Sequence, residues 1–443
     1  MNLNNLNTYP INQLSKQKFS CSCGQTHEII SNIAFDNISE KIDHYIEKII
    51  PPLSLISIIY NHFSKEKYGR VLDKKLGNAG YRVNSQTKET VGQPFCHSII
   101  PEDTRLILGI GSHSHQSEIK QLAYSLNIPY AFIPSCPSSH LLSLAPSYSL
   151  ENPKNTFDIF KVSPPALVLC EAAKNNYQSA VADNQSAIII PQAGSYFSLL
   201  SSKLVSLFDY QAAALLNAEK FCPDIFDQAL AIIDEATCDA LTIKNQFELE
   251  HSLKEKLIRY GALCQLKGNT RLVLGAEVTS AKIFSALTHY SGENTGENEF
   301  LLARVLMRLY VNYLQEENNF FTPPPSNNER ANLISSLLKI QEQTVLEKMR
   351  PLPNLYEENL ALYKLKTHRQ ELFALATEFD AKLTLAFSSL KKLYLDEGYS
   401  LINYLTKKES AFSISLAPDL APKFTFLSFM KDRGLLESML ASQ

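Results

Sequence analysis

Short apolar runs alternate with helical stretches through the first half of the chain. Within residues 106–145, the apolar run Leu106–Gly109 precedes Gly111, then apolar residues at helical spacing up to Leu126, then a second apolar run, Tyr130–Ile133. Runs of this length predict buried strands, and the spacing between them predicts a helix. The stretch therefore predicts one strand-helix-strand unit with a polar loop after each strand, at the edge where open α/β sheets bind ligands.

Further apolar runs flank this unit. Strand candidates are Leu53–Tyr60, Tyr81–Val83, Ala166–Cys170 and Ala187–Ile190, and a helix through Val71–Leu76 is expected to end at Gly77 or Gly80. Strands that alternate with helices predict a mostly parallel, doubly wound sheet, which is an α/β fold. We expect this nucleotide-binding type of domain to cover residues 21–190, after a loose leader of residues 1–20.

From Leu199 onward the apolar residues keep helical spacing nearly to the C-terminus. Residues 191–443 are therefore predicted to form an all-helical domain. Breaks are expected near Gly268, at residues 291–296, at the proline run 323–325, and around Pro351 and Pro353. The proline run is interpreted as a surface loop within one domain, with a linker as the alternative.

Composition and charge exclude several classes of protein. A chain of 443 residues with a formal net charge of −3 gives no reason to expect a nucleic acid or an anionic membrane as partner. No run reaches the roughly 18 continuous apolar residues that a membrane span needs, and the N-terminus has no signal-peptide pattern. We expect a cytoplasmic location, and the sequence leaves the oligomeric state open.

The eight cysteines are scattered and do not form a secreted disulfide framework. Cys21 and Cys23, with His27 close behind, can be interpreted as part of a metal site. A Cys-x-Cys pair without a second ligand pair is poor spacing for zinc, however, and this favours surface or packed thiols.

The loop after the run 106–109 contains glycines at Gly109 and Gly111, but it lacks the third glycine of the usual dinucleotide fingerprint. Such a loop can hold a pyrophosphate at the N-terminus of the following helix. An ordinary strand-to-helix turn is the alternative.

Five separated segments keep the order and spacing of one known family across nearly the whole chain. They are CSCGQTH at Cys21–His27, GSHSHQSEIK at Gly111–Lys120, NIPYAFIPSCPSS at residues 127–139, TRLVLGAEV at Thr270–Val278, and FTFLSFMKDRGLL at residues 424–436. Together they resemble the sn-glycerol-1-phosphate dehydrogenase family, a branch of the superfamily that also holds iron-type alcohol dehydrogenases, glycerol dehydrogenase and 3-dehydroquinate synthase.

The resemblance implies an N-terminal Rossmann-like domain, an all-helical C-terminal domain and a cleft between them. Members of the family reduce dihydroxyacetone phosphate to sn-glycerol 1-phosphate with NADH or NADPH. A divalent metal, held by one Asp and two His of the helical domain, polarises the carbonyl while the cofactor supplies hydride.

The three metal-ligand positions of the family fall on Leu199, Val278 and Thr295 of this chain. Leucine and valine offer no lone pair, and one threonine hydroxyl cannot hold a catalytic divalent ion. The resemblance therefore implies that the metal site is lost and that a metal cofactor is not expected. It leaves open whether the chain is an enzyme, and a pseudoenzyme is one interpretation. The nearest substitute ligands, each interpreted as a surface or structural residue, are Asp209, Glu277, His289, Glu293 and Glu297.

The cofactor loop departs from the family pattern as well. His113 and Ser117 replace a glycine and an aspartate, His140–Leu141 replaces an Asp-Gly pair, and Asn61 stands where the family has Asp. The cofactor-binding candidates are Gly109, Gly111, Ser112, Ser114, Lys120, Ser135 and Ser138. A relocated metal site made of His113, His115, His140 and Cys136 is a further hypothesis.

Three functions compete. The first is a diverged protein that binds a phosphorylated small molecule, a nucleotide or a protein partner, without metal-dependent catalysis. The second is an active NAD(P)H-dependent oxidoreductase that reduces dihydroxyacetone phosphate or a similar small phosphorylated carbonyl compound. The third is a metal-independent lyase or synthase acting on a sugar phosphate through Lys203, Arg271 and Glu277.

Overall fold

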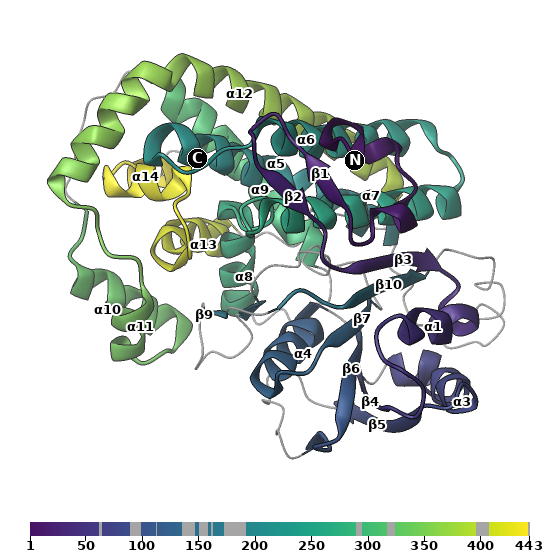
Figure 1. Ribbon diagram of the computed structural model, residues 1–443. Coiled ribbons are helices and arrows are strands. Elements are labelled where there is room, and N and C mark those ends of the chain that lie inside the picture. The colour runs from purple at the N-terminus through teal and green to yellow at the C-terminus, as the bar shows by residue number, and fades with distance from the viewer. Residues whose placement is uncertain are drawn as a thin grey trace. The chain divides into compact units, whose positions relative to one another are not determined.

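The structure is a computed structural model, and its elements are labelled in Figure 1. It describes residues 1–61, 64–88, 99–111, 113–134, 147–149, 158–160, 163–171, 192–288, 295–316, 324–395 and 407–441. The chain divides into two compact units. Unit 1 contains Met1–Glu151, Ile159–Tyr196 and Cys238–Asn269, and unit 2 contains Asn152–Asp158, Phe197–Thr237 and Thr270–Gln443.

Unit 1 is built on a six-stranded sheet whose paired strands are all parallel. The strands, in their order across the sheet, are β3 (Asn32–Asp36), β10 (Leu167–Glu171), β7 (Tyr130–Pro134), β6 (Thr104–Gly111), β4 (Leu55–Asn61) and β5 (Arg82–Lys88). Most residues of the central strands are buried, as expected for a parallel sheet covered on both faces. The predicted α/β fold class is confirmed.

Helices cover both faces of this sheet. Helices α1 (Ile38–Glu47) and α3 (Arg70–Asn78) lie on one face, and α4 (His113–Leu126) lies on the other (Figure 1). Alternate residues of β4 and β6 form one apolar cluster with the buried faces of α1 and α3. The connection between β6 and β7 through α4 is the predicted strand-helix-strand unit.

Residues 1–20, for which the sequence predicts a loose leader, are folded instead. They contain the short helices η1 (Leu3–Thr8) and η2 (Ile11–Leu14) and the strand β1 (Lys18–Ser20), which pairs antiparallel with β2 (Thr26–Glu28). Leu3, Leu6 and Leu14 are fully buried, so this segment contributes to a core. The sequence did not predict this core contribution because the three apolar residues are surrounded by polar residues rich in asparagine.

The remaining elements of unit 1 include the helix α7 (Gln246–Lys267) and a π-helical turn, Lys65–Gly69. Asn245 caps the start of α7 by accepting hydrogen bonds from two backbone N–H groups, and Gly268 ends it in the left-handed conformation. The break predicted near Gly268 is therefore confirmed. Two short strands, β8 (Ser147–Ser149) and β9 (Asp158–Phe160), are also described.

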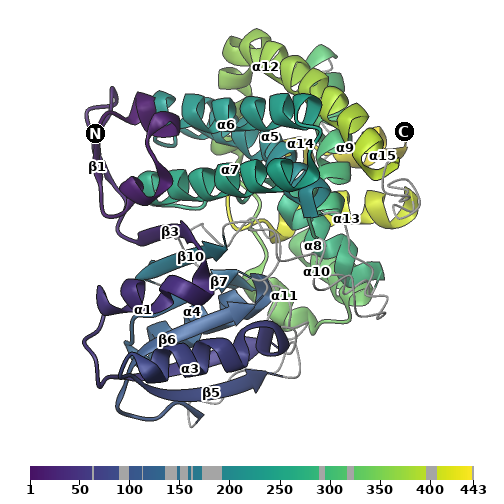
Figure 2. The ribbon, with the colours of Figure 1, turned by 90° about the vertical axis from the view of Figure 1, so that its right-hand side faces the viewer.

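The described residues from 192 to 441 form helices and no strand, as the sequence predicts. These helices are α5 (Gln192–Asn217), α6 (Pro223–Thr242), α7, α8 (Ala276–Thr288), α9 (Thr295–Gln315), α10 (Asn327–Leu338), α11 (Glu342–Lys348), α12 (Leu355–Leu395), α13 (Lys407–Leu420), α14 (Phe426–Asp432) and α15 (Leu436–Ala441). In unit 2, α8 packs on α9 and α13, and α9 packs along α12 (Figure 2). No helix among the described residues is long and apolar enough to cross a membrane.

Most predicted elements match observed ones within a few residues. The predicted strand Ala187–Ile190 lies outside the described residues. The sequence analysis missed β3 and α1, although the buried residues Ile38, Ile42 and Ile46 of α1 recur every four positions. The breaks predicted around Pro351 and Pro353 fall between α11 and α12, as expected.

Candidate functional site

The carboxyl edge of the unit 1 sheet is the first candidate site. From β4 the chain crosses to β5 on one side, and it then returns to β6 on the other side of β4. Ligands of open α/β sheets bind at such a switch point, outside the carboxyl ends of the strands. Here β4 ends at Asn61, β6 ends at Gly111, and α4 begins at His113.

The imidazole of His115 lies at this switch point. It is only 5% exposed, and its Nε2 atom donates a hydrogen bond to the carbonyl oxygen of Ile59 in β4, at 3.0 Å. A Cβ placed on Gly111 would lie 2.5 Å from Cδ2 of the His115 ring. Gly111 is therefore required for the packing of His115.

Gly109 is explained by packing between α4 and the sheet. A Cβ at this position would lie 2.5 Å from Cδ1 of Ile119 on α4 and 3.1 Å from a ring carbon of Phe132 on β7. Both glycines that suggest a dinucleotide loop thus have a structural reason without any ligand. Asn61 also has a local role, because its Oδ1 accepts a hydrogen bond from the backbone N–H of Ser64 at 2.8 Å.

Lys120 lies in the middle of α4 and is buried. Burial lowers the pKa of its ammonium group to about 7, against a smaller raising effect of Cys264. Of the other cofactor-binding candidates, Ser114 lies in the first turn of α4. Ser112, Ser135 and Ser138 lie outside the described residues. Their role in cofactor binding stays a prediction.

The described residues give little support to the hypothesis of a relocated metal site on the two loops. His115 is turned into unit 1 and bonds to a backbone carbonyl, so it is not presented to a ligand at a loop surface. His113 begins α4, but its side chain is not described, and Cys136 and His140 lie outside the described residues.

The ligand slots implied by the resemblance can be located in unit 2. Leu199 on α5 is 1% exposed and Val278 on α8 is fully buried. Thr295 is the first residue of α9, and its side chain is not described. Two of the three slots are thus occupied by apolar side chains in a buried environment.

A buried ion cluster lies on the same helices. Nζ of Lys203 on α5 contacts Oε2 of Glu299 on α9 at 2.6 Å and Oε1 of Glu277 on α8 at 3.4 Å. The Ser206 hydroxyl donates to Oε1 of Glu277 at 2.5 Å and accepts the backbone N–H of Gly275 at 3.0 Å. We call these residues the Lys203 cluster. The structure therefore brings Lys203 and Glu277 together, and it adds Glu299, which the sequence analysis missed.

The Lys203 cluster pairs one lysine with two carboxylates, and this arrangement sets the protonation states of its members. Burial raises the pKa of Glu277 to about 7, and Glu299 adds to this, while Lys203 and the Ser206 hydrogen bond lower it. Burial lowers the pKa of Lys203, but the two carboxylates together raise it above its usual value. The cluster thus holds a charged Lys203 and, below about pH 7, a protonated Glu277.

Arg271, the third catalytic candidate, has a different set of partners. Its guanidinium forms a two-pronged ion pair with Glu219 and donates to the carbonyl oxygen of Phe424 at 2.5 Å. Such a fork suits a side chain that fastens segments together, here the loop after α5 to the segment before α14. A joint catalytic role of Lys203, Arg271 and Glu277 stays a prediction.

Asp209 is the best placed of the substitute metal ligands, yet it serves as a helix cap. Its carboxylate accepts the backbone N–H groups of Ala276 at 2.9 Å and Phe426 at 2.8 Å, which are the first residues of α8 and α14. Burial raises its pKa to about 6 in spite of these hydrogen bonds. Glu297 lies in the first turn of α9. His289 and Glu293 lie outside the described residues.

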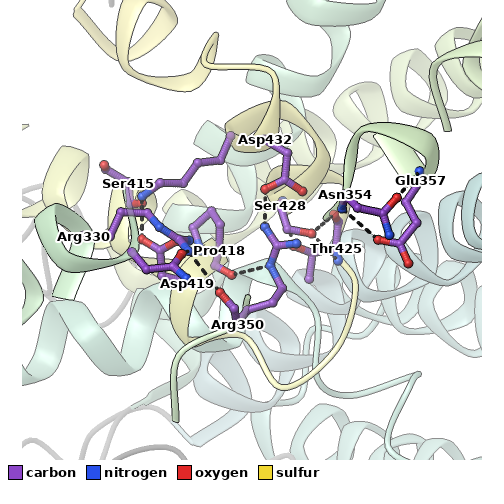
Figure 3. Close-up of polar contacts among 12 residues, drawn as sticks. Arg330, Arg350, Asn354, Glu357, Ser415, Pro418, Asp419, Thr425, Ser428 and Asp432 are labelled. Carbon is purple, nitrogen blue, oxygen red and sulfur yellow. Dashed lines mark hydrogen bonds and ion pairs between the residues drawn. The ribbon is translucent and has the colours of Figure 1, made fainter. Parts of the chain in front are cut away.

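The C-terminal segment of the resemblance belongs to a network of buried ion pairs (Figure 3). Asp419 on α13 contacts Arg330 of α10 at 2.5 Å and Lys431 of α14 at 2.7 Å. Arg350 bonds to Asp432 at 2.5 Å and to the carbonyl oxygen of Pro418 at 3.2 Å. These contacts fasten α10, α13 and α14 of unit 2 together, so this segment is explained by structure.

The Cys-x-Cys pair is the one place where described side chains resemble a metal centre. The Sγ atoms of Cys21 and Cys23 and a ring nitrogen of His27 lie within 4.8 Å of one another. The spacing in the sequence argued against a metal because a second ligand pair is missing. The structure places His27 together with the two thiols as a third ligand, so the expectation that a metal is absent is not supported.

The functional candidates that the sequence analysis missed are acidic partners from distant parts of the chain. Glu299 is 96 residues from Lys203, and Glu219 is 52 residues from Arg271. The local sequence around a single glutamate on a helix does not indicate which distant residue it contacts. Among these acidic residues only Glu277 could be identified from the sequence, because it is next to Val278, the position where the resemblance implies a metal ligand.

Comparisons with known proteins bear on the fold. No protein-family model matches the sequence, and no curated protein sequence matches it either. Solved structures do match over almost the full chain. A point mutant of an alcohol dehydrogenase from a halo-thermophilic archaeon of a Red Sea brine pool shares 12% identity, covering 93% of this chain and 96% of its own, with a TM-score of 0.53.

Two bacterial structures give the same result. A probable glycerol dehydrogenase from Sinorhizobium meliloti 1021 has 11% identity, 93% and 98% coverage of the two chains, and a TM-score of 0.51. An iron-containing alcohol dehydrogenase from Corynebacterium glutamicum has 10% identity, 93% and 94% coverage, and a TM-score of 0.50. This chain, with its parallel sheet and its helices from residue 192 onward, has the fold of the iron-containing alcohol dehydrogenases and glycerol dehydrogenases.

Proposed function

We propose that this chain is a non-catalytic relative of the sn-glycerol-1-phosphate dehydrogenases that binds a phosphorylated small molecule or nucleotide. The observation that carries the proposal is the content of the family's metal slots. Leu199 and Val278 are apolar and buried. Without lone pairs at these positions a divalent ion has nothing to hold it, and the carbonyl of a substrate loses its Lewis acid.

The charges next to these slots support the same proposal. Lys203 contacts both Glu277 and Glu299, and Asp209 caps two helices. A catalytic acid or base needs to reach the reacting atom, whereas Lys203 and the Oε1 atom of Glu277 are engaged by partners within the buried cluster. They stabilise unit 2 in the way that buried polar networks do.

The proposed ligand position is the carboxyl edge of the unit 1 sheet. The first turn of α4, which begins at His113 after β6 ends at Gly111, is where backbone N–H groups would bind an anion. His115 fills the space over Gly111. We therefore expect a small phosphate ester or mononucleotide to bind more tightly than a dinucleotide, whose pyrophosphate needs a close approach to the glycine backbone.

The test is a set of titrations on the full chain. NADH and NADPH are titrated by nucleotide fluorescence, and dihydroxyacetone phosphate, glycerol phosphate and AMP by calorimetry. Dihydroxyacetone phosphate reduction is then assayed with added Zn²⁺, Ni²⁺ or Fe²⁺. Binding of a phosphorylated compound without reduction supports the proposal, and turnover well above the blank without enzyme overturns it.

An active NAD(P)H-dependent oxidoreductase is the second candidate. The supporting observation is the likeness to structures of alcohol dehydrogenases and of a probable glycerol dehydrogenase. This candidate requires that NADH or NADPH bind, so the absence of a fluorescence change with either nucleotide would exclude it.

A further inference from the structure

We propose that Cys21, Cys23 and His27 bind one Zn²⁺ ion at the turn between β1 and β2 of unit 1. This site is separate from the metal position implied by the resemblance, which lies on the helices of unit 2. Its role is to fix the turn of the N-terminal hairpin and the ring of His27, which bonds to the C-terminal end of α7.

The hairpin backbone places both thiols on one short turn. β1 and β2 pair up to Ser20 and Thr26, which leaves residues 21–25 as the connection. The backbone N–H of Gly24 donates to the carbonyl oxygen of Cys21 at 3.2 Å, and Gly24 has a φ of +75°. Glycine adopts this conformation without strain. The tight turn keeps the two cysteines close despite only one residue between them.

The three ligand atoms lie close enough together to converge on one ion. All of them lie within 4.8 Å of one another, and Sγ of Cys23 is 3.3 Å from Nε2 of His27. Bonds of about 2.3 Å to sulfur and about 2.0 Å to nitrogen place tetrahedral ligands roughly 3.5–3.8 Å apart. Closing the site around an ion thus needs movements on the order of one ångström of the cysteine side chains.

His27 is oriented as a metal ligand would be. Its ring is 6% exposed, and Nδ1 lies 2.6 Å from the carbonyl oxygen of Leu266 at the end of α7. A carbonyl only accepts, so Nδ1 carries the proton and the lone pair of Nε2 is directed at Cys23. Histidine ligands are usually fixed in this way, by a hydrogen bond from the other ring nitrogen to a carbonyl or carboxylate.

The thiols are supported as well. The backbone N–H of Cys23 donates to Sγ of Cys21 at 3.4 Å. The segment after β2 is held to the same end of α7, because Oε1 of Gln265 accepts the backbone N–H of Ile30 at 2.7 Å. A bound ion would therefore hold in place the His27 ring, which together with Gln265 joins this part of the chain to α7.

The chemistry selects the ion. Two thiolates and one imidazole favour Zn²⁺ over Mg²⁺ or Ca²⁺, which prefer oxygen ligands. On binding, both thiols lose their protons, so two protons are released to solvent for each Zn²⁺ bound and no redox change occurs. A water molecule or another thiol of the chain supplies the fourth ligand.

The experiment uses the full chain purified under reducing conditions. Zinc content is measured by mass spectrometry of the metal, and the apo chain is reconstituted with Co²⁺, whose visible absorption reports tetrahedral thiolate ligation. We expect one equivalent of Zn²⁺, its loss in Cys21→Ser and Cys23→Ser, and an unchanged content in Cys238→Ser, the matched control at an exposed thiol of α6. Far-UV circular dichroism confirms that each variant is folded.

Three results would overturn the proposal. One is an apo chain that takes up no Zn²⁺ or Co²⁺ at micromolar concentration, and another is a Cys21→Ser/Cys23→Ser double variant that keeps its full metal content. The third is a Cys21–Cys23 disulfide that accounts for both thiols in the freshly isolated chain, with no metal uptake after reduction. If metal is bound, serine variants of Cys170, Cys222 and Cys264 identify the fourth ligand, and unchanged binding in all three assigns it to water.

Discussion

Individual residues account for the departures from the family pattern. The sequence comparison predicts that Leu199 and Val278 cannot ligate a metal, and that inference needs only the residue type. What it cannot predict is the surroundings of Lys203 and Glu277, because Glu299 and Ser206 reach them through packing of three helices. Gly275 shows the same limit, since a Cβ there would lie 2.7 Å from Cα of Ser206, a neighbour that the sequence does not identify.

The contact between Gly111 and His115 gives the first prediction. Gly111→Ala places a Cβ 2.5 Å from the His115 ring, so we expect a loss of about 1–3 kcal/mol in the free energy of unfolding, as for other overpacked sites. In a His115→Ala background the same change is expected to cost less than about 0.5 kcal/mol. Chemical denaturation of the four proteins of this double-mutant cycle measures the coupling. Additive losses would mean that Gly111 is required by something other than His115.

The carboxyl group of Glu277 gives the second prediction, on pH dependence. Its pKa is about 4.5 in the unfolded chain and about 7 in the folded chain, so the folded state binds more protons between these values. The stabilising contribution is therefore complete below pH 4.5 and is lost as the pH rises to about 7. A shift of this size corresponds to roughly 3–3.5 kcal/mol.

Measuring the free energy of unfolding of the wild type and of Glu277→Gln at several pH values reports on this group and the neighbours coupled to it, because the titrations of distant groups cancel in the difference. The wild type is expected to lose stability relative to Glu277→Gln as the pH increases. Glu347→Gln, which alters an exposed carboxylate on α11, shows what a surface change of the same kind does. A difference that stays constant between pH 4.5 and 7 would show that Glu277 is ionised throughout.

At the scale of elements, strands and helices could be predicted where their apolar residues form continuous runs or recur at a regular spacing. The strands β4, β6 and β7 are continuous apolar runs because they are buried on both faces, and such runs are visible without any tertiary information. β3 was missed because only two of its five residues are buried. The long helices from residue 192 were predicted from their spacing, while their mutual contacts depend on ion pairs such as Arg330–Asp419, which have no local pattern.

The buried network of α10, α13 and α14 gives the third prediction. Asp419→Asn keeps the shape of the side chain but removes the charge that Arg330 and Lys431 share, and Asp419 is only 1% exposed. Removing one partner of a buried ion pair typically costs about 3–5 kcal/mol. Thermal and denaturant unfolding measure the loss.

The matched control is Asp234→Asn, which breaks a more exposed pair with Lys382. We expect a cost of less than about 1 kcal/mol there, because solvent screens the pair. Equal effects of the two substitutions would mean that the ion pairs of Asp419 contribute no more than surface pairs do.

At the scale of the whole molecule, the sequence predicts a single boundary at residue 190/191, whereas packing groups α7 with the sheet. The reason lies in long-range contacts of α7 within unit 1. His27 bonds to Leu266, and Arg259 donates to the carbonyl oxygen of Leu6 at 3.0 Å. Contacts across more than 230 residues are not encoded in local periodicity. The order of the five family-like segments was more informative for the fold than any single motif.

That alignment can itself be tested by rebuilding the metal site. A Leu199→Asp/Val278→His/Thr295→His triple variant supplies one carboxylate and two imidazoles at the three family slots, on α5, α8 and α9. Without metal the variant is expected to be less stable than its parent, because polar groups replace buried apolar ones. Zn²⁺ in 100-fold excess over its dissociation constant would restore about 2.7 kcal/mol.

The variant is made in a Cys21→Ser/Cys23→Ser background, so that any zinc bound belongs to the rebuilt site. Zinc content and the zinc-dependent rise in Tm are compared with those of the same background carrying only Leu199→Asp and Val278→His. Two ligands hold an ion far more weakly than three, so the rise should need all three substitutions. If the triple variant folds and binds no zinc, the three positions do not face a common point, and the loss of the metal site must be argued from other residues.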